Sequence, residues 1–279
     1  MDIAFWGIRG SHPAIAEYSA YGNHTSCVEV TAGNLRLIFD AGTGIHSLGK
    51  TLIKDCENKE LHLFFTHYHL DHVLGLLNFQ PVYQPNWNIY FYGPKSENRS
   101  CETVLKEIFD KPYHPIALKD LSSTRIFTTL GSRDRFNLSA GEKEEDRVFI
   151  ESLALNHPGG ALGYRVTYKQ KSFAYITDVV LGESADKEEI IRFIEGADLL
   201  VTDTTYSNED YQKMPMKRSW GHSSWEEAVE LATSSKVKRL MLFHLDPNKD
   251  DRELDRIFKA GKKAFDELAI PREGESFTL

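Results

Sequence analysis

The residues best suited to chemistry form one short run. His67, His69, Asp71 and His72 spell His-x-His-x-Asp-His directly after the apolar segment 61–65. Imidazole nitrogens and carboxylate oxygens are ligands that zinc, iron and manganese accept. Four candidate ligands are more than one tetrahedral ion needs when it also holds a water molecule. The run therefore predicts two metal ions, with a set of unrelated structural histidines as the alternative.

Three further polar residues each follow a predicted strand. The strands cover 148–155, 172–177 and 237–243, and the residues that follow them are His157, Asp178 and His244. Side chains at strand ends can converge into open space. Each of these residues alone would be read as a turn residue, but three in one chain favour additional ligands. His62 lies inside a strand and is predicted to be structural, and no role is predicted for His12, His46 and His114.

The elements that must position these residues alternate along the chain. Apolar segments predict strands at 3–8, 27–31, 35–39, 61–65, 88–92, 148–155, 163–167, 172–177, 199–202 and 237–243. Residues 32–34 predict a hairpin turn, and the polar stretch 131–146 predicts an exposed turn between strands. Helices are predicted at 99–109, 187–194, 223–233 and 252–268. With no repeat or linker, residues 1–279 predict one α/β domain with two mixed sheets between helices.

Composition narrows the class of partner and the compartment. The chain has 33 basic and 41 acidic residues and a net charge of −8, which disfavours general binding to a polyanion. Cys27, Cys56 and Cys101 form no CxxC pair, which predicts a reducing compartment without disulfides. No apolar stretch is long enough to span a bilayer, and the N-terminus reads as a strand rather than a signal peptide. We therefore predict a cytoplasmic protein that does not bind membranes.

Together these residues resemble the metallo-β-lactamase superfamily over nearly the whole chain. The resemblance includes Asp40, within the segment Phe-Asp-Ala-Gly-Thr-Gly at 39–44, followed by the histidine run and the later residues in the expected order. It implies an αββα sandwich of two mixed sheets flanked by helices, with two divalent ions at one sheet edge. Zinc is the expected metal, and manganese and iron are the alternatives. The resemblance implies one ion on His67, His69 and His157, a second on Asp71, His72 and His244, Asp178 between them, and Asp40 holding ligands in place.

The C-terminal part resembles the phosphodiesterase branch of that superfamily, which includes ribonuclease Z and cyclic phosphodiesterases. Segment 198–206 is followed by Gly-His-Ser-Ser at 221–224 and a predicted helix. His222 matches a histidine that lies beside the scissile phosphate in that branch. Asp203 takes the place of a glutamate that partners this histidine, and its shorter side chain leaves the direct contact open. A helix-entry role for His222 is the alternative, since Ser223 is a good N-cap.

The activity implied by this resemblance is hydrolysis of a small or cyclic nucleotide phosphodiester. A hydroxide bridging two metals about 3.5–4 Å apart would attack phosphorus. Asp71, His222 and Asp203 are the predicted catalytic residues, with His222 as proton donor. Dimers are common in this branch, so a homodimer is expected by analogy.

Other activities remain open at this point. A tRNA 3′-processing endonuclease would need a basic arm, and the one basic cluster between Asp178 and His222 is the short segment 213–218. A thioester or lactone hydrolase would not require His222. A non-catalytic metal-binding protein is disfavoured because every expected ligand is present. The N-terminus also resembles a bacterial subgroup with Gly-x-Arg-Gly-Ser, here at 7–11, and a loop at 21–27 that departs at Asn23 and His24.

Overall fold

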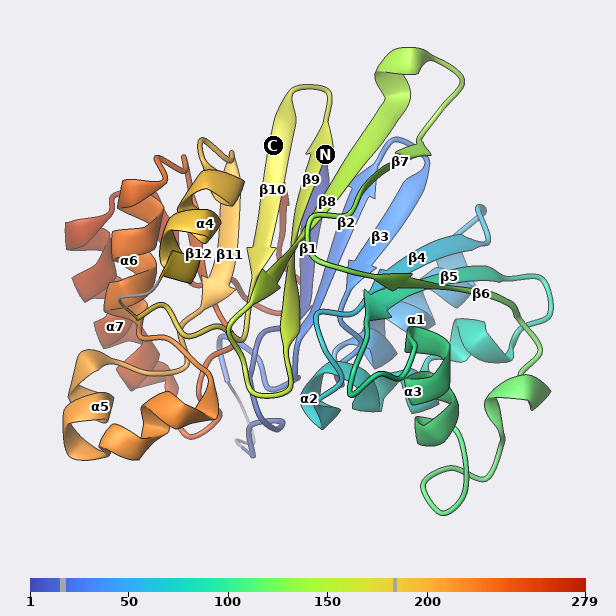
Figure 1. The fold of residues 1–279 in the computed structure, drawn as a ribbon, viewed down its shortest axis with the longest axis horizontal. Helices are drawn as coiled ribbons and strands as arrows, with labels where there is room; N and C mark the ends of the chain where they lie inside the picture. Colours follow the sequence, from blue (N-terminus) through green and yellow to red (C-terminus); the bar gives the residue numbers. More distant parts are fainter. Residues whose placement is uncertain (16–18, 183–184) are drawn as a thin grey trace.

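Two mixed β-sheets of seven strands each pack face to face within residues 1–15, 19–182 and 185–279, the part described by this computed structural model (Figure 1). The first sheet has the order β14 (Ser276–Thr278), β1 (Asp2–Gly7), β2 (Cys27–Ala32), β3 (Leu35–Phe39), β4 (Glu60–Phe64), β5 (Asn88–Pro94) and β6 (Thr124–Leu130). The second has the order β13 (Leu268–Ala269), β12 (Leu240–Phe243), β11 (Leu199–Asp203), β10 (Lys171–Ile176), β9 (Ala161–Tyr168), β8 (Arg147–Leu155) and β7 (Arg135–Ser139).

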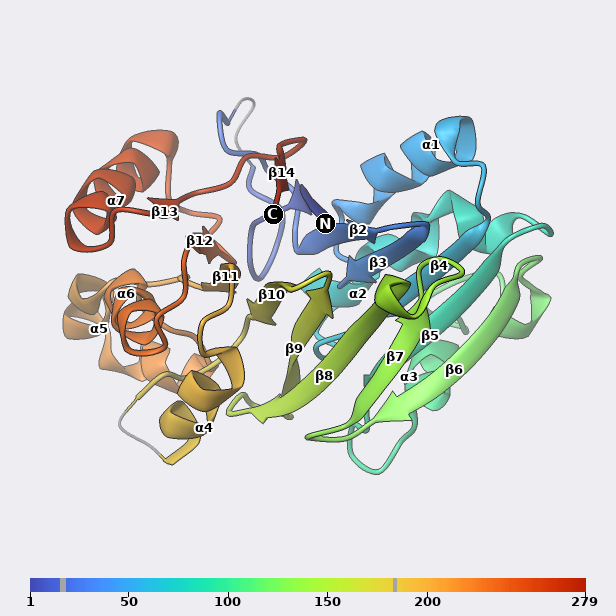
Figure 2. The same ribbon diagram turned by 90° about the horizontal axis from the view of Figure 1, so that it is seen from above.

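Helices cover the outer faces of both sheets, and Figure 2 shows them on opposite sides of the sandwich. The first sheet carries α1 (Ile45–Asp55), α2 (Leu70–Val73) and α3 (Cys101–Ile108). The second carries α4 (Ala185–Ile194), α5 (Asn208–Lys213), α6 (Trp225–Ser234) and α7 (Asp251–Ala264). Short 3₁₀ helices include η1 (Leu74–Asn78), η2 (Gln80–Tyr83), η3 (Leu118–Asp120), η4 (Glu144–Asp146) and η5 (Pro215–Trp220). Among the described residues, none of the helices has the length and apolar character needed to cross a lipid bilayer.

Burial explains why the central strands are apolar on both faces. One core lies between the sheets, and a second lies beneath the helices that cover the first sheet. A strand covered on both faces reads as a continuous apolar run rather than an alternating one. Residues Leu61–Phe64 of β4 are all buried, as is every residue of β11.

Strand direction gathers the polar residues at one edge. Strands β3 to β6 run parallel to one another, and so do β10 to β13. The carboxyl ends of parallel strands meet at the same sheet edge, where open α/β proteins bind their ligands. The residues that follow β3, β4, β10 and β12 are therefore brought together.

The predicted αββα sandwich is confirmed, and so is the hairpin at Gly33, whose φ is +60°. Three predictions about its elements are wrong. The segment 131–146 is not only a turn, because it contains the edge strand β7, whose residues are exposed or half-buried. The last helix ends at Ala264 rather than continuing to 268, because Phe265 takes an extended backbone and leads into β13. The N-cap of α6 is Ser224 rather than Ser223.

Candidate active site

Three residues turn sharply as they leave their strands. Asp40, Asp178 and His244 have φ angles of +60°, +54° and +53°. Left-handed backbone is uncommon in residues other than glycine, and it concentrates at functional sites when the surrounding structure enforces it. All three side chains are buried at this edge. The strained turns direct them into one cluster instead of letting the chain continue along the sheet.

The structure brings together all seven residues predicted as metal ligands. Ligand atoms of His67, His69 and His157 lie within 4.8 Å of one another, and so do those of Asp71, His72 and His244. Asp178 lies between the two groups, with Oδ2 at 3.3 Å from Nε2 of His72 and Oδ1 at 3.8 Å from Nε2 of His67. This grouping is the one the resemblance implies. That these residues bind metal stays a prediction.

A carboxylate behind the first strands orients one histidine of each group. Nδ1 of His72 donates to Oδ2 of Asp40 at 2.8 Å. Nδ1 of His67 lies 3.0 Å from the Thr66 hydroxyl, which donates to the same carboxylate at 3.0 Å. With Nδ1 protonated, Nε2 of each ring keeps a lone pair directed at the cluster. Asp40 therefore fixes both the orientation and the tautomer of two candidate ligands.

The second sheet repeats this arrangement. Nδ1 of His244 lies 3.0 Å from the Thr205 hydroxyl, which donates to Oδ1 of Asp203 at 2.7 Å. Nδ1 of His157 donates to the carbonyl oxygen of Gly221 at 2.9 Å, because a carbonyl only accepts. Both rings again leave Nε2 available. Sequence analysis missed the two threonine links, because a lone hydroxyl residue carries no pattern.

The cluster has the properties of a cation site. Nε2 of His67 is buried and has no hydrogen-bond partner among the described residues. Burial lowers the pKa of His67, and the neighbouring His72 lowers it further, so this ring stays neutral. Burial alone would also lower the pKa of His72, but the carboxylates of Asp178, Asp71 and Asp40 raise it well above its usual value. The same negative charge favours a divalent ion, so the residues present fit one.

His222 lies beside this cluster and contacts Asp203 directly. Its Nδ1 is 2.9 Å from Oδ2 of Asp203, and its ring centre is 5.0 Å from that of His244. The contact that the short aspartate left open is therefore made. Burial alone would lower the pKa of His222, but the charge and hydrogen bond of Asp203 outweigh it and raise the pKa to about 9. Below that value the ring is a cation with one N–H available to donate.

The Gly-x-Arg-Gly-Ser segment packs against the same cluster. The backbone N–H of Ser11 donates to Oδ2 of Asp71 at 2.7 Å. A Cβ built on Gly10 would lie 2.3 Å from the His244 ring, so only glycine fits there. Arg9 is buried and donates to backbone carbonyls of Gly22 and Lys249. The segment therefore supports two candidate ligands from outside the predicted set.

Of the remaining histidines, His12 lines a pocket together with His222, whereas His62 and His24 have other contacts. His62 is buried in β4, stacks on Tyr90 and meets the Tyr92 hydroxyl at 3.2 Å, which agrees with a structural role. The side chain of His24 lies 3.3 Å from the Thr43 hydroxyl, and its backbone N–H donates to Glu273. These contacts account for His24 without a ligand.

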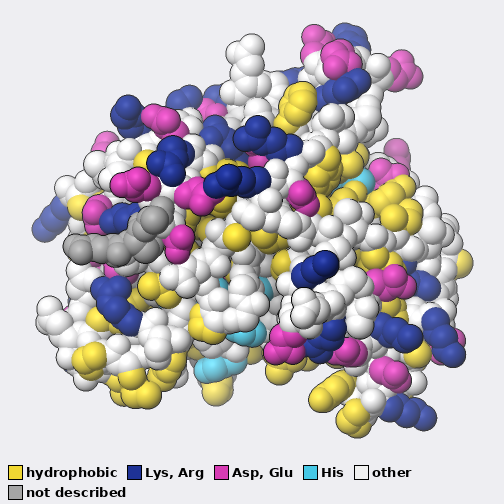
Figure 3. Space-filling model, in the orientation of Figure 1, with side chains coloured by type: hydrophobic (Ala, Val, Ile, Leu, Met, Phe, Trp, Pro, Cys, Tyr) yellow, Lys and Arg dark blue, Asp and Glu magenta, His cyan; other side chains and the backbone are white. Residues whose placement is uncertain are grey.

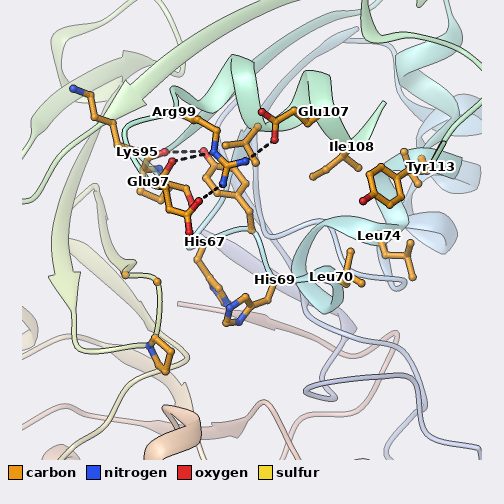
Figure 4. Close-up of a pocket in the computed structure, with 18 residues that line it drawn as sticks. His67, His69, Leu70, Leu74, Lys95, Glu97, Arg99, Glu107, Ile108 and Tyr113 are labelled. Carbon is orange, nitrogen blue, oxygen red and sulfur yellow. Dashed lines mark hydrogen bonds and ion pairs between the residues drawn. The ribbon is translucent and has the colours of Figure 1, made fainter. Parts of the chain in front are cut away.

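Two pockets adjoin the cluster. One has a volume of about 630 Å³ and includes His67 and His69 in its lining (Figure 4). The other, of about 520 Å³, includes Ser11, Thr205 and His222. Histidine side chains reach the surface near the lower edge of Figure 3, next to exposed hydrophobic side chains.

Comparison with known proteins agrees with the fold and identifies the superfamily. Residues 35–245 match the family described as the beta-lactamase superfamily domain. Ribonuclease Z of Thermococcus sibiricus is 26% identical over 317 residues, covering 100% of this chain and 98% of the relative. Ribonuclease Z of Methanothermobacter thermautotrophicus is 28% identical, covering 95% and 92%.

Solved structures share the fold across the whole chain. Human tRNase Z, short form, has a TM-score of 0.70 at 18% identity and covers 100% of this chain and 99% of its own. A diphosphatase from the PhnP family has a TM-score of 0.70 at 18% identity, covering 100% and 97%. Zinc-bound PqqB from Methylobacterium extorquens has a TM-score of 0.74 at 14% identity, covering 100% of both chains. The chain therefore belongs to the beta-lactamase superfamily and is a metal-dependent hydrolase, and the relatives that it matches over its whole length are named ribonuclease Z.

Proposed function

We propose that this protein hydrolyses a small phosphodiester, cyclic nucleotides included. The observation that supports this reaction is the pair formed by His222 and Asp203, 2.9 Å apart and next to the metal-ligand cluster. Hydrolysis of a phosphodiester releases an alkoxide that must be protonated, whereas hydrolysis of a thioester releases a thiolate that needs no proton. A cationic imidazole held at the edge of a cation site can supply the proton that the alkoxide needs.

The seven clustered residues would hold two divalent ions. His67, His69 and His157 would bind one and Asp71, His72 and His244 the other, with Asp178 shared. When bound, such ions neutralise phosphoryl oxygens and make water a nucleophile at neutral pH. Zinc suits the nitrogen-rich set, and manganese and iron are alternatives.

The residues of the chain supply positioning and a proton. Asp203 accepts the Nδ1 hydrogen of His222 and so fixes the ring, which leaves Nε2 to donate to the leaving oxygen. Asp71 is itself fixed by the Ser11 N–H. Burial raises the pKa of Asp71 and Asp178, but the adjacent histidines more than reverse this and keep both carboxylates ionised. Water attacks phosphorus, the bond from phosphorus to the leaving oxygen breaks, and that oxygen takes the His222 proton. One proton of the attacking water then returns to His222, and the other stays on the phosphomonoester.

A small substrate is favoured over tRNA by the state of the basic cluster. Lys213 forms an ion pair with Glu209 at 2.6 Å, and Arg218 pairs with Glu227 at 2.8 Å. Cations that are already paired give little attraction for an RNA backbone. The ribonuclease Z of Thermococcus carries insertions that this chain lacks, because the alignment spans 317 positions and this chain has 279 residues. Processing of tRNA 3′ ends is the second candidate, because the curated relatives are named ribonuclease Z.

The test compares substrates on protein loaded with zinc, manganese or iron. Bis(4-nitrophenyl) phosphate, 2′,3′- and 3′,5′-cyclic nucleotides, pre-tRNA, a thioester and a lactone form the panel. We expect turnover of the diesters, and we expect His222→Ala to keep its metal while losing about 10²–10⁴-fold in kcat on the cyclic nucleotides, whose alkoxide leaving group needs the proton. His46→Ala, a half-buried histidine on α1, is the control. Activity on the acyl substrates alone, or unchanged diester turnover by metal-loaded His222→Ala, would overturn the proposal.

Compartment and assembly remain proposals as well. Cys27, Cys56 and Cys101 are buried and unpaired, which supports a reducing compartment such as the cytoplasm. A homodimer is proposed by analogy with the branch, and size-exclusion chromatography with light scattering would test it.

A further inference from the structure

The larger pocket beside the cluster has an apolar wall that the metal chemistry does not require. We call it the leucine pocket, and its apolar lining includes Leu70, Leu74, Leu77, Val104, Ile108 and Tyr113. These side chains come from α2, η1, α3 and the loop after α3. In Figure 4, Leu70 and Leu74 lie near Ile108 and Tyr113 on one side of the pocket, and His67 and His69 lie beside them.

Several of these side chains are left exposed. Leu70 is 67% exposed, Leu74 42% and Tyr113 76%. Large apolar side chains that gather around one opening mark a binding surface more often than isolated ones do. Because this opening leads to the candidate metal ligands, its occupant would be part of the substrate.

The charges in the pocket cancel one another. Arg99 is paired on both sides, with Glu107 at 2.6 Å and with Glu97 at 2.9 Å. Lys95 is the other basic residue of the lining. Two basic and two acidic side chains give the lining no formal net charge. A paired guanidinium offers little to a second phosphate, so a nucleic acid backbone would gain little here.

Another part of the lining carries almost no side chain. Gly159 and Gly160 line it after Pro158, and a Cβ built on either glycine would meet no atom within 4 Å. Their φ angles are +86° and +80°, so glycine is required by the backbone. This part of the lining is therefore open, which leaves room for a group that packs against the leucine side.

The two pockets beside the cluster are lined by different residues. The leucine pocket shares no lining residue with the second pocket, which contains His222, Tyr206 and Trp220. If the leaving oxygen lies at His222, its organic group extends toward the second pocket. The leucine pocket then faces the group that stays attached to phosphorus.

We propose that the leucine pocket binds the retained ester group of the substrate and selects an uncharged apolar or aromatic group without a second phosphate. This inference rests on the proposed phosphodiesterase activity. Water adds to phosphorus, the bond to the leaving alcohol breaks, and the proton passes to that alcohol. The products are a phosphomonoester, whose organic group occupied the leucine pocket, and a free alcohol.

The experiment holds the leaving group constant and varies the retained group. Methyl, phenyl and thymidine 5′-esters of 4-nitrophenyl phosphate all release 4-nitrophenolate, which absorbs visible light. We expect kcat/KM for the phenyl ester to exceed that for the methyl ester by roughly tenfold or more, because more apolar area leaves water. A 3′-phosphate added to the thymidine ester should lower kcat/KM.

Substitutions locate the effect. Leu74→Asp and Tyr113→Ala should each reduce the ratio of kcat/KM for the phenyl ester to kcat/KM for the methyl ester. Tyr113→Ala tests the same prediction if Leu74→Asp does not fold. Phe149→Ala is the matched control, since Phe149 is 51% exposed on β8 and outside this pocket. Equal rates for the methyl and phenyl esters, or a ratio that falls equally in Phe149→Ala, would overturn the inference. A failure of the phosphodiesterase proposal looks different, because no ester would then be cleaved.

Discussion

Oδ2 of Asp203 lies 2.9 Å from Nδ1 of His222, and the other oxygen of this carboxylate accepts a 2.7 Å hydrogen bond from Thr205. Thr205 in turn meets Nδ1 of His244. One carboxylate thus orients both the proposed proton donor and a candidate metal ligand. The arrangement couples the protonation of His222 to the geometry of the metal centre, and it gives Asp203 two separable effects.

The first prediction concerns pH. Asp203 overcomes burial and raises the pKa of His222 to about 9, so the ring is protonated below that pH and loses its proton above it. Activity that needs this proton should fall as pH rises through that value. Asp203→Asn removes the charge, so the alkaline limb of kcat/KM should move to lower pH. The measurement is a pH–rate profile at saturating metal.

Asp203→Glu is the control for this prediction. It keeps the charge, so its alkaline limb should stay closer to that of the unchanged protein. An identical alkaline limb in Asp203→Asn and the unchanged protein would show that His222 is not the group that titrates.

The second prediction concerns metal affinity through Asp40. This carboxylate holds His72 directly and His67 through Thr66, one residue from each candidate metal group. Asp40→Asn should therefore lower the affinity of the site for both ions by about 10–100-fold, because ligands that lose such a hydrogen-bond partner bind metal less tightly. Titration against a chromogenic chelator measures both affinities. Asp120→Asn, on an exposed 3₁₀ helix, should change neither, and loss of a single ion in Asp40→Asn would contradict the shared role.

The metal centre was predictable because its residues follow apolar strands. The run ending at His72 and the residues after β8, β10 and β12 stand at points where the hydrophobic pattern stops. Because the strands run parallel, these residues meet at one edge of the sandwich, and the order of strands in the sequence is enough to identify that edge. The hydrogen bonds that orient the candidate ligands could not be predicted from the sequence. Thr66 and Thr205 act through single hydroxyls, and the Ser11 contact uses a backbone N–H, which no side-chain pattern reveals.

The sequence pattern did not predict the edges of the sheets, nor helix α1 (Ile45–Asp55). Strand β7 lies at a sheet edge, and its half-buried Phe136 and Leu138 are the residues that pack against the core. With two apolar positions among polar neighbours, its segment looks like a polar loop. Strand β13 is two residues long, too short for an alternating pattern. The leucine pocket was missed for the opposite reason. Leu70 and Leu74 have the spacing of core-facing helical residues, yet they are exposed.

The third prediction concerns Gly10. A Cβ at this position would lie 2.3 Å from the His244 ring, so Gly10→Ala must displace either the ring or the segment that holds Asp71. We expect fewer metal ions per chain at limiting metal, measured by plasma mass spectrometry, and a matching loss of activity. Gly131→Ala is the control, because a Cβ there comes no closer than 3.7 Å to another atom. Full metal content in Gly10→Ala would show that the segment yields without disturbing the ligands.

The fourth prediction concerns stability at a site away from the metals. Asp198 accepts from the Ser172 N–H at 2.8 Å and from Lys238 Nζ at 2.9 Å. Burial alone would raise the pKa of Asp198, but Lys238 and the Ser172 hydrogen bond lower it below its ordinary 3.8. A carboxyl whose pKa is lowered on folding stabilises the protein above its unfolded pKa, and this contribution is lost as pH falls through the folded pKa.

Asp198→Asn should therefore unfold more easily at neutral pH. Because Lys238 is largely exposed, the expected loss is only about 1 kcal/mol in the free energy of unfolding. Urea unfolding at pH 7 and at pH 5 should give the same difference between the two proteins, and the difference should shrink below the unfolded pKa of Asp198. Other carboxylates titrate in both proteins alike, so the difference isolates this one. A difference that stays constant into strong acid would mean that Asp198 acts through packing and not through its charge.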